Sequence, residues 1–111
     1  MRPLLNRLLA LEEAVRVPDG AGGSSLTWVE RGKLWAEVRP LRAGEGPGEF
    51  VTVSTAALRI TVRAAPAGAP SRPRAEQRFR EGERVYRIHA VTEIDGRMRY
   101  LACQASEEVR T

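Results

Sequence analysis

Apolar and polar side chains alternate without interruption over residues 33–40, Lys-Leu-Trp-Ala-Glu-Val-Arg-Pro. A period of two is typical of a β-strand with one face in a protein core. One face of this predicted strand carries Leu34, Ala36 and Val38, and the other carries Trp35, Glu37 and Arg39. Pro40 lacks a backbone N–H and therefore ends the strand.

Similar patterns predict further strands on both sides of this segment. Residues 26–30 form a short strand, separated from the first by a break at Arg31-Gly32, and Trp28 is expected to pack across the two strands against Trp35. Residues 58–63 alternate cleanly, and a short strand is expected around Phe79. The pattern therefore favours sheet over most of the chain.

Residues 85–93 and 98–104 flank Ile94-Asp95-Gly96-Arg97. Asp-Gly between two alternating apolar segments is the strongest short-range signal of a β-hairpin. In this hairpin Tyr86, Ile88 and Ala90 are expected to share one face.

The N-terminal segment 4–16 fits two patterns. Leu4, Leu8, Leu11 and Val15 follow a helical period, so periodicity alone favours a helix. A period of two also fits part of the segment, although Glu13 interrupts that face. Asn6 and Arg7 break the leucine run, so a signal peptide is not expected.

Glycine and proline mark the connections. We expect a flexible turn at 18–25, a long loop at 41–57 and a connector at 64–73. The 111 residues suffice for a single domain, 1–111. With five to seven short strands joined by turns, the predicted fold is all-β: a small antiparallel barrel or sandwich of about six to seven strands with a long inserted loop.

The sequence contains few residues that could form a catalytic or metal-binding site. One histidine, His89, and one cysteine, Cys103, exclude a site built from several of either residue. We expect packing or an ordinary hydrogen bond for His89 and a buried thiol for Cys103. No nucleophile elbow or phosphate-binding loop is present, so the sequence predicts neither an enzyme nor a cofactor.

The formal net charge is +4, and seventeen of the eighteen basic residues are arginine. This charge permits contact with nucleic acid or with an acidic partner without requiring either. Arginines concentrate in residues 72–87, where Glu76, Glu81 and Glu83 are interleaved with them. For this segment a subunit interface or a solvated surface is favoured, and DNA contact is the alternative.

The order of these patterns resembles a known family. A strand reading LWAEVRP, a Gly-Glu loop, a strand reading LRITVR and then GERVYRIHAVTEIDGRMRYL are similar to phage head–tail joining proteins, also called head-closure, stopper or head–tail adaptor proteins. PDGAGG followed by TWVERGKLWAEVRP makes the versions encoded by gene transfer agents the most similar. The resemblance covers residues 5–108.

The resemblance implies a small β-barrel whose copies form a ring around the DNA channel, with portal and adaptor proteins above and tail proteins below. It implies that Arg7–Arg16 is a strand rather than a helix. It also implies that the loop 41–57 projects toward the channel or a neighbouring subunit. Expected positions are the neck of a virion or phage-like particle, after synthesis in the bacterial cytoplasm.

Two sets of residues follow as candidates. Those expected at the DNA channel or on the loop are Arg39, Arg42, Glu45 and Phe50, although ion pairing of the two arginines with Glu37 or Glu45 is an equal alternative. Those expected at a subunit interface are Trp35, Glu37, Arg78 and Arg80. The predicted function is a non-catalytic head–tail connector that holds double-stranded DNA without reading its sequence; the alternative is a small-barrel nucleic-acid-binding module.

Overall fold

The computed structural model describes residues 2–41, 56–94 and 99–108. They form six antiparallel strands, and no helix occurs in these ranges. The strands are β1 (Arg7–Pro18), β2 (Ser24–Pro40), β3 (Ala56–Arg63), β4 (Arg78–Glu81), β5 (Arg84–Glu93) and β6 (Tyr100–Glu107). The predicted all-β fold is therefore confirmed.

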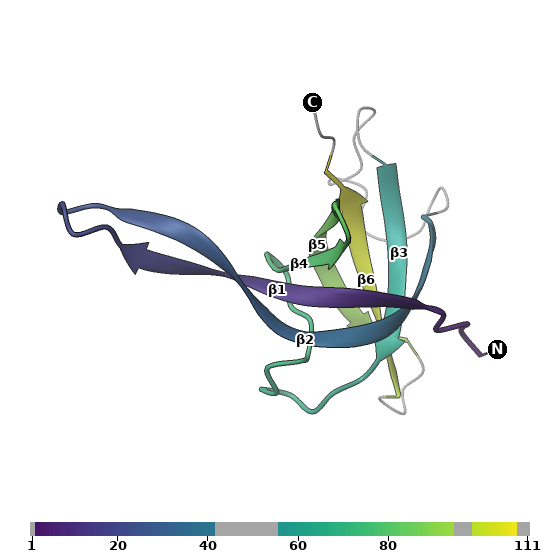
Figure 1. Cartoon of the computed structure of the whole chain (residues 1–111). Coiled ribbons are helices and arrows are strands. Elements are labelled where there is room, and N and C mark those ends of the chain that lie inside the picture. The colour runs from purple at the N-terminus through teal and green to yellow at the C-terminus, as the bar shows by residue number, and fades with distance from the viewer. Residues whose placement is uncertain (1, 42–55, 95–98, 109–111) are drawn as a thin grey trace.

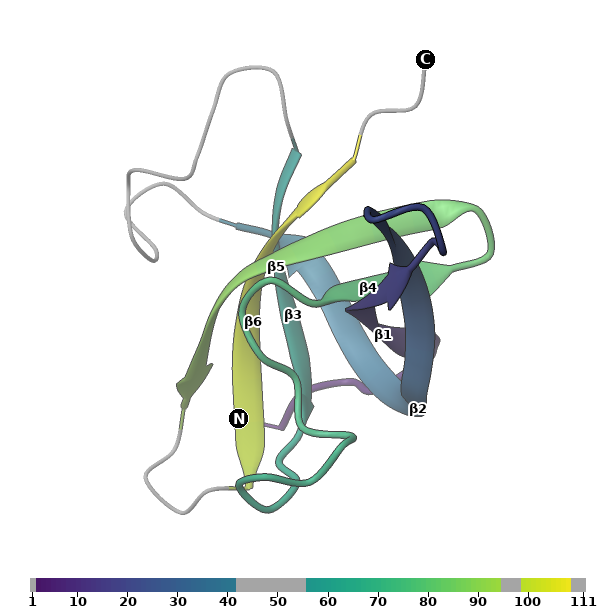
Figure 2. The same ribbon diagram turned by 90° about the vertical axis from the view of Figure 1, so that its left-hand side faces the viewer.

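The strands close into a barrel in the order β1-β2-β3-β6-β5-β4 (Figure 2). The four-residue strand β4 completes the ring, because it pairs with β5 on one side and with Ala10–Glu12 of β1 on the other. Because β4 is short, it covers only part of the facing edges of β1 and β5. The core inside is formed by alternate residues of every strand, among them Leu9, Ile60, Phe79 and Tyr86.

The N-terminal segment is a strand, so the helix favoured by periodicity is wrong and the strand implied by the resemblance is correct. Leu9 and Leu11 point into the core, whereas Leu8 is exposed on the outside. Ala10 and Glu12 are also buried, because β4 lies beside them. Because consecutive residues are buried, apolar and polar side chains do not alternate here as they do in a strand with one buried face. Alternation therefore could not identify this strand.

Strand β2 runs without a break through Arg31-Gly32, which corrects the prediction of two strands. Leu11 faces Gly32 and Glu12 faces Glu30, so Arg31 is the extra residue of a β-bulge. A Cβ on Gly32 would lie 3.3 Å from the Cβ of Ser71, which favours glycine here. Trp28 and Trp35 consequently lie on one strand and cannot form a cross-strand pair.

Beyond the bulge, β1 and β2 leave the barrel as a two-stranded ribbon, residues 13–30, which we call the arm (Figure 1). Strand β4 pairs with β1 only up to Glu12, and β3 pairs with β2 only from Ala36 onward. The arm ends in a turn where the Asp19 carboxylate accepts hydrogen bonds from the backbone N–H groups of Ala21 and Gly23. It contributes to a longest dimension of 52 Å.

A second bulge, at His89, changes the face of β5. Ile88 faces Ala105 and Ala90 faces Gln104, so Ala90 does not share the inward face of Tyr86 and Ile88 as predicted. Val91 packs against the core instead. The predicted pairing of the two hairpin strands is confirmed by this register, while the turn residues 95–98 lie outside the described ranges.

Cys103 lies on β6 and is completely buried, as expected. Burial raises the pKa of its thiol to about 12. Since the thiolate is the reactive form, we expect the native protein to react with a disulfide reagent at pH 8 about 100-fold or more slowly than the urea-unfolded chain. Stopped-flow thiol titration measures both rates, and equal rates would contradict the buried position.

Candidate interaction surfaces

The arginines of the segment 72–87 form ion pairs with carboxylates of the same chain. Each of its six arginines lies within 4 Å of a carboxylate: Arg72 with Glu93, Arg74 with Glu13, Arg78 and Arg80 with Glu12, Arg84 with Glu107, and Arg87 with Glu76. The carboxylates come largely from distant strands, so the pairs connect elements around the barrel. This segment therefore contributes little net positive surface.

The most deeply placed of these pairs lies where the arm leaves the barrel. Glu12 is 5% exposed, and its two carboxylate oxygens accept hydrogen bonds from Arg78 Nε at 2.7 Å and Arg80 Nε at 2.9 Å. The Arg78 guanidinium also stacks on the ring of Trp28, 4.0 Å from its centre. Burial alone would raise the pKa of Glu12, but the two arginine hydrogen bonds outweigh it and lower that pKa.

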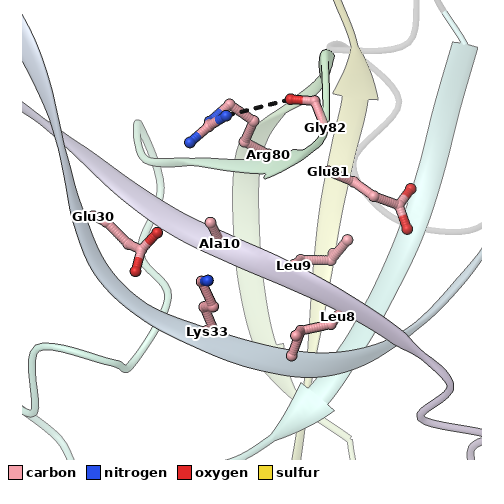
Figure 3. Close-up of a pocket in the computed structure, with 8 residues that line it drawn as sticks. All are labelled: Leu8, Leu9, Ala10, Glu30, Lys33, Arg80, Glu81 and Gly82. Carbon is pink, nitrogen blue, oxygen red and sulfur yellow. Dashed lines mark hydrogen bonds between the residues drawn. The ribbon is translucent and has the colours of Figure 1, made fainter.

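A shallow hollow of about 220 Å³ opens between the β1–β2 ribbon and the β4–β5 turn (Figure 3). Leu8, Glu30 and Lys33 line one side, and Arg80 lines the other, donating a hydrogen bond to the Gly82 carbonyl at 3.3 Å. Close by, Arg7 pairs with Glu81, and both side chains hydrogen-bond the Tyr86 hydroxyl. The lining of this hollow includes both polar and apolar side chains. Among its described residues, no nucleophile lies beside a general base.

Trp35 projects from β2 and is 56% exposed. It faces Leu8 of β1, which is 42% exposed, so the two form an apolar pair on the outside of the barrel. Glu37, two residues along the same face, accepts a hydrogen bond from the Leu4 N–H at 2.9 Å. Exposed aromatic side chains are enriched where proteins contact partners.

A separate surface gathers arginines on the outside of β2, β3 and β6. Arg39 of β2 faces Arg59 of β3, and Arg63 of β3 faces Tyr100 of β6 with its guanidinium 5.7 Å from the ring centre. Arg2 lines one hollow with Arg39 and Arg59 and a second with Arg63, Arg99 and Tyr100. We call this surface, Arg2, Arg39, Arg59, Arg63 and Arg99, the basic face.

The predicted site residues divide between these surfaces. Arg39 belongs to the basic face, Trp35 and Glu37 lie beside it on β2, and Arg78 and Arg80 bind Glu12 at the base of the arm. Arg42, Glu45 and Phe50 lie outside the described residues, together with most of the loop 41–57.

Sequence reasoning did not select Arg2, Arg59, Arg63 or Arg99. The alternation in residues 58–63 already placed Arg59 and Arg63 outward; the missing information was the register that sets Arg59 beside Arg39. His89 is half-buried with its Nε2 2.7 Å from Ser106 Oγ, which confirms an ordinary hydrogen bond. Burial, followed by the charge of Arg87, lowers the pKa of His89.

The described residues contain no group of three or more histidine, cysteine, aspartate or glutamate side chains placed to hold a metal ion. They also include no helix long and apolar enough to cross a membrane.

The fold defines a class of small closed antiparallel barrels with a projecting ribbon, and comparisons identify the family. The family model described as "Phage head completion protein" matches residues 1–108. A chain in a solved structure, "Virion of native gene transfer agent (GTA) particle", is 58% identical; the alignment covers 99% of this chain and 100% of that chain, with a TM-score of 0.79. No curated protein matches the sequence.

The chain therefore belongs to the phage head completion protein family, which supports a structural role at the junction of head and tail. The resemblance to head–tail joining proteins, and to gene transfer agent versions in particular, is confirmed. Protein SF1141 from Shigella flexneri 2a, known from a solution structure, shares the fold alone: it is 19% identical with a TM-score of 0.71, over 96% of this chain and 95% of that chain.

Proposed function

We propose that this protein is the head–tail connector, or stopper, of a tailed phage-like particle of the gene transfer agent type. Copies form a ring around the DNA channel between the portal and adaptor proteins and the tail. The observation that carries this proposal is the 58% identity, over 99% of the chain, to a component of a gene transfer agent virion. The protein is made in the bacterial cytoplasm, is incorporated at the particle neck and catalyses no reaction.

A ring built from identical subunits needs two different surfaces on each copy, which meet head to tail. The barrel and the arm supply surfaces of different shape, and the exposed Trp35 with Leu8 offers an apolar contact beside them. Together with Glu37, Arg78 and Arg80, Trp35 remains our candidate for contact between subunits. In this proposal the single domain 1–111 acts as one connector unit.

On the channel side, Arg39 and Arg42 stand at the base of the loop 41–57, which also carries Glu45 and Phe50. We assign this loop to the channel or to a neighbouring subunit. DNA in the channel would be held through its phosphates, without sequence preference.

The test is removal of the gene from a producing strain and complementation with an epitope-tagged copy. Without the protein, we expect tailless heads and a loss of gene transfer of at least about 100-fold, because later tail proteins lack their attachment ring. With the tagged copy, electron microscopy of labelled particles should place the tag in a ring at the neck. Normal tailed particles in the deletion strain would overturn the proposal.

A further inference from the structure

The exposed apolar side chains gather in two places. Among the residues that the structure describes, six large apolar side chains are exposed, and five of them lie in two groups. One group, which we call the barrel patch, is Leu4, Leu8 and Trp35, and the other, on the arm, is Val17 and Leu26. The sixth is Ile94, beyond the end of β5. Single exposed apolar side chains are common on proteins, whereas grouped ones mark contact sites.

The barrel patch is one surface arranged around Trp35. Leu8 of β1 is the direct strand partner of Trp35. The Leu4 N–H donates a hydrogen bond to Glu37, which projects from the same face of β2 as Trp35, so Leu4 lies beside this pair. An aromatic side chain with aliphatic neighbours is typical of the centre of a protein–protein interface.

The arm carries its apolar side chains where no third strand of the described chain covers them. Strand β4 pairs with β1 only up to Glu12, and β3 pairs with β2 only from Ala36 onward. Leu26, which is 58% exposed, pairs across the ribbon with Arg16, and Val17 projects from the opposite face. A two-stranded ribbon is only marginally stable in water by itself. The arm therefore has the form of an element that packs on a further surface.

The barrel patch and Leu26 lie far apart on the same β1–β2 ladder. Figure 1 shows the arm leaving one side of the barrel and the N-terminal segment at the other side. Along β2, Leu26 and Trp35 are separated by about 30 Å, given about 3.3 Å per residue. Because both belong to one continuous strand, a single chain cannot bring them together. A contact between them joins two copies head to tail, and such contacts close into a ring or extend as a filament.

The charged neighbours of the two surfaces are complementary. Arg16 stands beside Leu26 on one face of the arm and donates a hydrogen bond to Ser24 Oγ at 3.1 Å. Glu37 stands two residues from Trp35 on one face of β2. Each charge lies about 5 to 7 Å from its apolar neighbour, so the arginine can face the glutamate when Leu26 packs on Trp35. An apolar centre with opposite charges at its rim favours a second copy of this chain as the occupant.

We propose that the arm of one copy packs on the barrel patch of a second copy, with Leu26 against Leu8 and Trp35. Arg16 then lies beside Glu37 of the second copy. The placement of this contact in a ring at the particle neck rests on the proposed function above, whereas the contact between copies is a property of the protein itself. Trp35 is its central residue, because tryptophan at the centre of an interface contributes much of the binding energy.

The first test compares three variants that each place one negative charge on an exposed apolar position. L26E changes the arm, W35E changes the barrel patch, and I94E is the matched control outside both. Circular dichroism and urea unfolding establish that all three are folded, and sedimentation over a series of protein concentrations measures self-association. We expect association at least about 30-fold weaker for L26E and W35E, and within about threefold of the unchanged protein for I94E. Equal losses in all three variants, or an unchanged protein that stays monomeric at every concentration, would overturn the proposal.

An equimolar mixture of L26E and W35E tests the head-to-tail arrangement. The L26E copy keeps its barrel patch and the W35E copy keeps its arm, so the mixture contains one intact pair of surfaces. We expect dimers with about the affinity of the unchanged protein, and no larger assemblies, because the remaining arm and patch are both altered. A contact made by the same patch on both copies would not be restored by mixing, and a mixture without dimers would therefore overturn the proposal.

Complemented particles separate this inference from the proposed function. In the deletion strain, we expect tagged I94E at the particle neck and a loss of L26E and W35E from the neck of at least about tenfold. Entry of all three variants in equal amount would overturn docking of the arm and leave the connector function standing. Absence of the unchanged protein from the neck would instead refute the connector function, while the association of copies in solution would still decide this inference.

Discussion

Replacement of Phe79 by alanine is expected to lower the free energy of unfolding by about 4 kcal/mol. Phe79 is completely buried on β4, the four-residue strand that closes the barrel, with Leu11 opposite it on one side and Tyr86 on the other. Truncation loses the free energy gained by burying the phenyl ring. It also leaves a cavity beside β4, the shortest strand of the barrel. Urea denaturation followed by circular dichroism measures the loss.

Trp35→Ala is the matched control. It removes a larger aromatic side chain that is 56% exposed, so we expect a loss below about 1 kcal/mol. A loss at Trp35 as large as the loss at Phe79 would contradict the outward position of Trp35. A barrel that tolerates Phe79→Ala without change would show that β4 is not needed for closure.

The alternating segments were predictable from the sequence because one face of each strand is buried and the other is solvated. Residues 33–40 and 58–63 have the faces that alternation assigned to them, with Ala36, Ile60 and Val62 inside. The Asp-Gly signal likewise identified the strands β5 and β6. Register is a different matter, since alternation fixes the face of a residue without fixing its partner.

Prediction failed where the local pattern and the tertiary surroundings disagree. The period of Leu4, Leu8, Leu11 and Val15 suggested a helix, yet Leu8 is exposed and its neighbour Leu9 is buried. The bulges at Arg31 and His89 add one residue and thereby shift the following side chains to the other face. Neither bulge has a signal in the sequence that separates it from a turn or a regular strand.

The surfaces depend on contacts between distant residues, which explains why they were only partly predicted. Arg78 was selected for a subunit interface, and the structure places it between Glu12 and Trp28 of its own subunit. Arg39 was selected at the channel, and its partner Arg59 became visible through strand register. The interface and channel assignments of these residues stay predictions for the experiments above.

The second large effect is expected at Glu12. Glu12→Gln keeps the size of the side chain, but it removes the charge that neutralises Arg78 and Arg80 and turns an N–H group toward one of them. Breaking a buried ion pair by removing one partner costs about 3 kcal/mol, because the remaining charge stays buried. Since Glu12 is 5% exposed and Arg78 is largely covered, we expect a loss of that size in urea unfolding at pH 7.

Glu13→Gln is the control on the adjacent position. Glu13 also contacts two arginines, Arg31 at 3.1 Å and Arg74 at 3.0 Å, but it is partly exposed, and exposed pairs contribute about 0.5 kcal/mol. The two variants share strand, charge change and number of arginine partners, so the difference between them isolates burial. Equal losses would show that burial of Glu12 has no energetic consequence.

The lowered pKa of Glu12 predicts how the stability of the protein depends on pH. The folded-state pKa of Glu12 is lowered below its ordinary value of 4.5, so the unfolded chain takes up a proton first as the pH falls. The stability contributed by Glu12 is therefore complete above pH 4.5 and is lost progressively as the pH falls below it toward the folded-state pKa. Urea unfolding between pH 7 and pH 3 should show a smaller acid-induced loss for Glu12→Gln than for the unchanged protein. An unchanged slope would mean that the two arginines do not hold the Glu12 carboxylate in its charged form.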